Sequence, residues 1–190
     1  MLLFITGLIL FFAVHSISII SDSWRDDMAQ RLGERPWRVL HGLASLGGLV
    51  LLVWGYGIAR NVPVVLYTTP DWLRHVNFFL MLFVFPLLLA VFFPGRIKTA
   101  VKYPAFTAAK IWAFAHLLVN GALADVLLFG CFLAWAVAGR ISMKHRRPRP
   151  APGFPETAAN DLIAVVAGLG IYALFLFILH SRLIGVPLII

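Results

Sequence analysis

Residues 104–138 read PAFTAAKIWAFAHLLVNGALADVLLFGCFLAWAVA, and this stretch decides the class of fold. It is largely apolar and much longer than the roughly 20 residues that an α-helix needs to cross a bilayer. Asn120 and Gly121 interrupt it with residue types that favour a tight turn. The stretch therefore predicts two antiparallel membrane helices, at residues 104–119 and 122–138, joined by a short hairpin.

Apolar runs of similar length occur on both sides of this hairpin. They predict four further spans, at residues 2–20, 39–59, 72–93 and 162–180. The composition agrees, because 61% of the 190 residues are hydrophobic and 13% are charged, whereas a soluble domain carries about 25% charged residues. The mean hydropathy is +0.91. We predict an all-α polytopic membrane protein, a single domain over residues 1–190 with a bundle of about six transmembrane helices in the lipid bilayer.

The lysines and arginines are distributed unevenly along the predicted spans. The segments between spans one and two, three and four, and five and six, together with the start of span four, which carries Lys110, hold all of them except Arg60, Arg74 and Arg182. Under the positive-inside rule these segments are cytoplasmic, so both termini are expected on the periplasmic side of a bacterial inner membrane. The net charge of +8 is therefore interpreted as a topology signal, and no nucleic-acid partner is expected. The basic, proline-rich residues 140–155 predict an extended cytoplasmic loop.

Small residues are expected where membrane helices pack closely together. The second span supplies Gly42, Ala44, Ser45, Gly47 and Gly48, and the last supplies Ala164, Ala167, Gly168 and Gly170. Pro86 lies inside the third span and is expected to kink it. The residues interpreted as anchors at the membrane interface are Trp24, Trp37, Trp72 and Tyr103.

Histidines at membrane depth are the first candidates for chemistry, because polar groups there are costly. His15 lies in the first span and His116 in the fourth. Helical spacing is expected to put Trp112 and Asn120 on the same face as His116. Small Ala113 beside that face leaves room for a planar cofactor. A lone membrane histidine more often forms a hydrogen bond between helices, and that alternative stays open.

The types of residue in the spans restrict the kind of metal site. The only acid in the predicted spans is Asp125, so the carboxylate-rich set of a di-iron site is missing. Neutral imidazoles in an apolar bundle suit haem iron. Spacing along the membrane normal leaves two arrangements open. His15 and His116 share one haem, or His15 pairs with His41 and His116 with His180. Asp125 either orients neighbouring groups or assists an imidazole.

The sequence around His116 contains a series of short motifs: Trp112, Ala115-His116-Leu117, Asn120-Gly121, Phe129-Gly130 and Trp135. Together they resemble the signature of the NnrU family of bacterial membrane proteins. His15 after its aromatic run, and the C-terminal residues 180–188, are also similar to the family. The resemblance covers nearly the whole chain.

This resemblance carries implications for function. The family is related to the plant 15-cis-zeta-carotene isomerase, a membrane enzyme that uses haem b with histidine ligands. Carried over by position, the two ligands are His15 and His116. The family's namesake is associated with nitric oxide reductase expression, which implies a link to denitrification. Two departures weaken a transfer of isomerase activity: Tyr103-Pro104 stands where the family usually has His-Pro, and Ala113 replaces a cysteine of the isomerase.

Three functions are consistent with these features. The first is a haem b-binding accessory protein or sensor in nitrogen-oxide respiration, with a subunit of a respiratory complex as its partner. The second is a haem-dependent cis–trans isomerase of a lipophilic polyene. The third is a non-catalytic membrane assembly factor whose histidines only join helices. We favour the first, and these alternatives leave open whether the protein is an enzyme.

Overall fold

The structure is a computed structural model that describes residues 1–146, 149 and 153–188. Apart from one isolated bridge between Val65 and Ala122, these residues contain helices and loops and no strand, which confirms the all-α class. The chain forms two compact units, each built from two stretches of sequence: Met1–Thr69 with Asn120–Pro148, and Pro70–Val119 with Arg149–Ile190. Part of the predicted cytoplasmic loop, at residues 147–148 and 150–152, lies outside the described residues.

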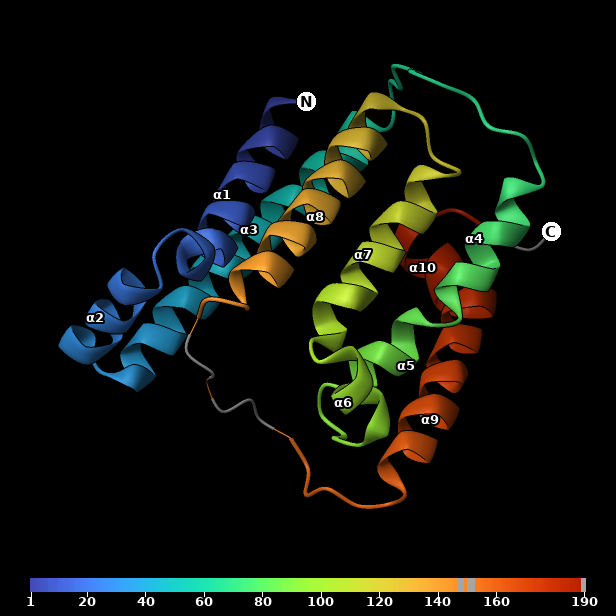
Figure 1. Ribbon diagram of the computed structural model, residues 1–190. Coiled ribbons are helices and arrows are strands. Elements are labelled where there is room, and N and C mark those ends of the chain that lie inside the picture. The colour runs from blue at the N-terminus through green and yellow to red at the C-terminus, as the bar shows by residue number, and fades with distance from the viewer. Residues whose placement is uncertain (147–148, 150–152, 189–190) are drawn as a thin grey trace. The chain divides into compact units, whose positions relative to one another are not determined.

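The first unit contains α1 (Leu2–Ile20), α2 (Asp22–Leu32), α3 (Glu34–Ala59) and α8 (Leu123–Ser142). In this unit α1 packs along α3 and also contacts α8 (Figure 1). Glycines permit the close approach of α1 and α3. A Cβ atom at Gly48 would come within 2.8 Å of the backbone nitrogen of Phe11, and one at Gly55 would clash with the backbone of Phe4. These contacts define an antiparallel register, with Phe11 opposite Gly48 and Phe4 opposite Gly55.

The second unit contains α4 (Leu73–Met81), α5 (Val84–Leu89), α6 (Arg96–Val101), α7 (Pro104–Leu117) and α9 (Asn160–Leu174). A π-helical turn, η1 (Phe175–Leu179), continues α9 into α10 (His180–Ile184). In this unit α5 packs against α7 and α9 (Figure 1). The Asp161 carboxylate accepts hydrogen bonds from the backbone N–H groups of Arg96 and Ile97, at 2.9 and 3.0 Å. These two hydrogen bonds connect the start of α6 with the start of α9.

Four helical segments of the described chain are long and apolar enough to cross a bilayer: Leu2–Ile20, Glu34–Ala59, Leu123–Ser142 and Asn160–Ile184. The first has the predicted bounds, and the second begins five residues before the predicted one, at Glu34. The predicted span at 104–119 becomes α7, whose 14 residues reach only about 21 Å against roughly 30 Å of hydrocarbon. The structure thus confirms a helical protein with four or more candidate spans, and the count of six stays a prediction.

The predicted third span is interrupted, as the proline within it suggested. α4 ends at Met81 and α5 begins at Val84. Pro86 has no N–H to donate to the carbonyl oxygen of Leu82, and its ring crowds that carbonyl. The helix therefore breaks about one turn before Pro86. The backbone of Pro86 in turn packs against Gly168 of α9, where a Cβ atom would meet it at 2.5 Å.

The prediction that small residues of the second and last spans lie at helix contacts is confirmed only in part. Gly48 lies at the α1–α3 contact and Gly168 at the α5–α9 contact. Gly42, Gly47 and Gly170 were expected at such contacts, but a Cβ atom at each would meet nothing within 4 Å. Composition identified α3 and α9 as helices that each pack closely against a neighbour. It did not identify which face of each helix makes that contact. Which glycine touches a neighbour depends on the rotation of each helix about its axis.

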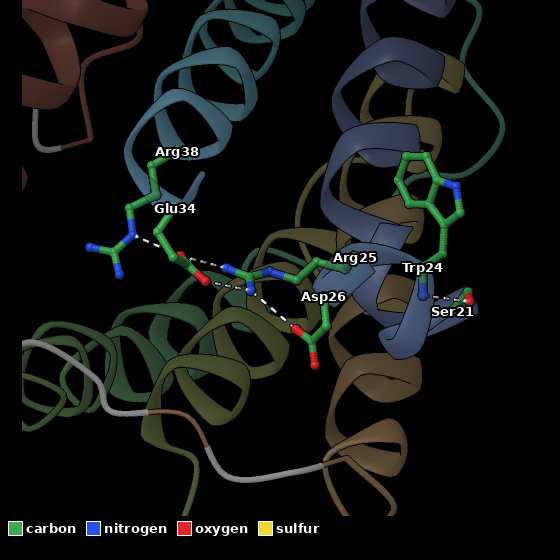
Figure 2. A network of polar contacts seen from close by, with 6 residues as sticks. All are labelled: Ser21, Trp24, Arg25, Asp26, Glu34 and Arg38. Atoms are coloured by element: carbon green, nitrogen blue, oxygen red, sulfur yellow. Dashed lines mark hydrogen bonds and ion pairs between the residues drawn. The ribbon is translucent and has the colours of Figure 1, made fainter. Parts of the chain in front are cut away.

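The sequence prediction did not include α2, a polar helix between two spans. The Ser21 hydroxyl caps it by accepting a hydrogen bond from a backbone N–H of its first turn at 3.3 Å. Arg25 forms ion pairs with Asp26 at 3.1 Å and with Glu34 at 3.3 Å, and Glu34 also lies 3.5 Å from Arg38 (Figure 2). Glu34 and Arg38 belong to α3, so this network links α2 to the next helix.

Lys102 adopts a backbone conformation that suits glycine, with φ at 66° and ψ at −48°. The N–H of Tyr103 donates across it to the carbonyl of Val101 at 2.8 Å, which forms a strained γ-turn. Lys102→Gly is expected to raise the free energy of unfolding by about 1 kcal/mol, because glycine has no Cβ atom to strain. Thermal unfolding in detergent checks this. Lys110→Gly makes the same change inside α7 and should instead destabilise by about 1 kcal/mol. A lower Tm for Lys102→Gly would contradict the argument.

Candidate functional site

His15 is held in a defined orientation within α1. Its Nδ1 atom lies 2.8 Å from the carbonyl oxygen of Phe11, one turn earlier. Because a carbonyl oxygen only accepts, Nδ1 carries the hydrogen in this contact and Nε2 holds the free electron pair. The ring also stacks on the ring of Phe11, with 4.0 Å between centroids. A backbone carbonyl that fixes the tautomer in this way is common for metal-ligating histidines.

A second imidazole lies against His15 in the same unit. The ring of His41, from α3, meets the His15 ring edge to face with centroids 5.7 Å apart. Trp37, one turn before His41, packs on it at 6.2 Å and also contacts Trp24 of α2 at 6.0 Å. Trp37 is 9% exposed, so it packs within this group, whereas the sequence suggested an anchor at the membrane interface. The structure therefore brings together His15 and His41, one of the pairings left open above.

α8 contributes aromatic side chains to the same place. The Trp135 ring lies 6.0 Å from that of His15, and its Nε1–H donates to the backbone carbonyl of His15 at 3.3 Å. Phe132 packs against Phe11 at 5.6 Å. We call the following set the histidine cluster: Phe11, His15, Trp37, His41, Phe132 and Trp135. Sequence reasoning singled out His15 and held His41 in reserve, but it missed the tertiary contacts of Trp37 and Phe132.

The donor set of the histidine cluster restricts what it can bind. Among the residues that the structure describes, no group of three or more His, Cys, Asp or Glu side chains is arranged to hold a metal ion. A bare zinc ion usually needs three or four protein ligands. A metal that carries its own macrocycle needs only one or two axial imidazoles and packs well against aromatic walls. The chemistry of the cluster therefore fits a haem better than a bare metal ion.

His116 belongs to the second unit, whereas His15 belongs to the first, and each is described within its own unit. The Nδ1 atom of His116 lies 2.8 Å from the carbonyl oxygen of Trp112, and the two rings are 5.2 Å apart. The predicted contact of Trp112 with His116 is thus present. Next to it, the buried Asn77 donates from Nδ2 to the carbonyl of Ala115 at 2.6 Å. His116 therefore shares with His15 the tautomer fixed by a carbonyl one turn earlier.

Asn120 does not continue the helical face of His116. α7 ends at Leu117, so the residues after it no longer follow helical spacing. Asn120 belongs to the first unit, where its backbone carbonyl accepts a hydrogen bond from the Tyr67 hydroxyl at 3.0 Å. The prediction that Asn120 shares a helix face with Trp112 and His116 was therefore wrong. The sequence remains apolar after Leu117, so hydropathy did not show that the helix ends there.

His180 and Asp125 each have a local partner. The Nδ1 atom of His180, in α10, lies 2.8 Å from the carbonyl oxygen of Val186. Asp125, in the first turn of α8, accepts a hydrogen bond from the Tyr56 hydroxyl of α3. Burial, together with the charge of Asp125, raises the pKa of the Tyr67 phenol in the adjoining loop. Asp125 thus orients its neighbours at one end of the first unit, the simpler of its two interpretations.

The length and hydropathy of the helices define the class of protein: it is a helical membrane-type protein, with several apolar helices that suit a lipid bilayer. The comparison with known families then gives the particular assignment. The model of the family described as NnrU protein matches residues 3–188, nearly the whole chain, so the chain belongs to the NnrU family. No curated protein and no solved structure matches the chain.

Proposed function

We propose that this NnrU-family membrane protein binds haem b through His15 and acts as an accessory protein or sensor in nitrogen-oxide respiration. One observation carries the proposal: the imidazoles of His15 and His41 lie 5.7 Å apart at their centroids within an aromatic cluster. The link to nitrogen-oxide respiration rests on the family resemblance described above. Bound haem would supply an iron centre able to bind a small ligand or to exchange an electron.

The residues present fit such a group. His15 presents Nε2, the nitrogen with the free electron pair, because Nδ1 donates to the carbonyl of Phe11 at 2.8 Å. The hydrogen bond of the His15 side chain runs to a carbonyl of its own helix. This bond therefore does not join helices, which favours coordination by His15 over the role of a helix connector. Phe11, Phe132 and Trp135 supply the apolar walls that a macrocycle requires.

His15 is common to both proposed ligand sets. The family resemblance favours His15 with His116, and the geometry of the first unit favours His15 with His41. His180 is the remaining alternative. A lipophilic small molecule is the proposed small-molecule partner. A subunit of a respiratory complex is the proposed protein partner.

The proposed location is the bacterial inner membrane, with both termini in the periplasm. Support comes from the basic residues between the spans, which mark the cytoplasmic side. A reporter fused to either terminus should be active only if it is a periplasmic type, such as an alkaline phosphatase. Activity of a cytoplasmic reporter at either terminus would contradict this orientation.

Purification tests haem binding directly. Protein expressed in haem-replete cells and extracted in mild detergent should show a Soret band, and its pyridine haemochrome should have the spectrum of haem b. A colourless preparation would contradict the proposal.

Deletion of the gene should lower nitric oxide reductase activity in membranes and leave the carotenoid isomers unchanged. A changed isomer profile with normal reductase activity would favour a polyene isomerase instead.

A further inference from the structure

Ser45, in the middle of α3, has a buried hydroxyl without a partner. Its Oγ atom is shielded from solvent and makes no hydrogen bond among the described residues. A serine in a helix usually satisfies its hydroxyl by bonding to the carbonyl four residues earlier. A buried polar atom left without a partner destabilises the fold, so each such atom calls for an explanation.

The register of α1 and α3 locates this hydroxyl. Gly48 lies opposite Phe11, so one helical turn further along the two antiparallel helices Ser45 lies across from Val14 and His15. Ser45 also follows His41 by four residues and therefore shares its helix face. The unpartnered hydroxyl thus lies beside the histidine cluster.

In the described part of the chain His41 also has no side-chain hydrogen bond, although its half-buried ring is not shielded from solvent as the Ser45 hydroxyl is. Its ring contacts those of His15 and Trp37, and within the described residues its side chain makes no hydrogen bond. His15, by contrast, is held by the carbonyl of Phe11. Two polar groups on one face of α3, one turn apart, therefore lack partners at the place where two imidazoles meet.

We propose that Ser45 is a ligand-contacting residue of this site, and that its hydroxyl forms a hydrogen bond with a polar atom of the molecule bound beside His15 and His41. This inference rests on the proposed function and adds to it a third polar contact from α3. The aromatic walls and the single hydroxyl select a flat, lipophilic molecule that carries a hydrogen-bonding group. Haem b is the probe with which this is tested.

The test compares Ser45→Ala with the wild-type chain, each prepared with haem and from haem-deficient cells. Without haem, Ser45→Ala should raise Tm by about 2–4 °C or more, because it removes an unsatisfied buried hydroxyl. With haem, it should weaken haem affinity about tenfold, because the hydrogen bond to the ligand is lost. Ser45→Ala should thus be favourable without haem and unfavourable for haem binding. This combination distinguishes a ligand contact from a purely structural role.

Ser21→Ala is the matched control. It removes a serine hydroxyl that already caps α2, so it should lower Tm in both states and leave haem affinity unchanged. A lower Tm of haem-free Ser45→Ala would mean that a water or a helix already satisfies the hydroxyl, and would overturn the inference. Unchanged haem affinity in Ser45→Ala would also overturn it and leave the proposed function intact. A wild-type chain that binds no haem would overturn both.

Discussion

His15→Ala is expected to abolish stable haem binding, lowering the affinity by at least about 100-fold. Loss of an axial ligand should cost no less than loss of the groups that orient one, which typically costs 10–100-fold. The Soret band of the purified variant should be absent or greatly reduced at a haem concentration that saturates the wild-type chain. His145→Ala replaces a histidine in the basic segment that follows α8 and should leave the spectrum unchanged.

The second ligand is identified by the same measurement on two further variants. If the first unit alone holds the iron, His41→Ala should shift the spectrum and His116→Ala should not. If the arrangement implied by the family resemblance holds, His116→Ala should shift it and His41→Ala should have a small effect. A normal spectrum in His15→Ala would contradict both arrangements.

The helical class and the first span could be predicted because they depend on local sequence. The apolar run at 2–20 is an uninterrupted helix, and the break before Pro86 follows from the chemistry of one residue. α2 could not be predicted in the same way. Its sequence is polar, and it is stabilised by ion pairs of Arg25 with Glu34 in the following helix. Hydropathy contains no information about such a tertiary contact.

The histidine cluster illustrates the same limit for the site. The sequence singled out His15 from its depth in the bilayer, but His41 was only a reserve candidate near the end of its span. Their proximity depends on the register of α1 against α3, which backbone contacts at Gly48 and Gly55 define. Trp37 had the features of an interface anchor, yet it is buried against His41. A pattern along one helix cannot state which residue of another helix lies opposite.

In this register Gly48 contributes both to the packing of α3 against α1 and to the position of the histidine cluster. Gly48→Ala would place a Cβ atom 2.8 Å from the backbone nitrogen of Phe11 and 2.9 Å from its Cα atom. Backbone cannot move aside as a flexible side chain can, so α1 must shift away from α3. We expect a loss of about 1–3 kcal/mol in the free energy of unfolding, as for other overpacked contacts.

The adjacent glycine is the matched control. A Cβ atom at Gly47 meets nothing within 4 Å, so Gly47→Ala should stabilise α3 by about 0.5–1 kcal/mol through helix propensity alone. The two variants make the same chemical change one residue apart and should move Tm in opposite directions. Because Phe11 also holds His15 through its carbonyl, Gly48→Ala should weaken haem binding as well, and Gly47→Ala should not. Equal Tm shifts for both variants would mean that the α1–α3 contact does not have this register, and the pairing of His15 with His41 would lose its structural basis.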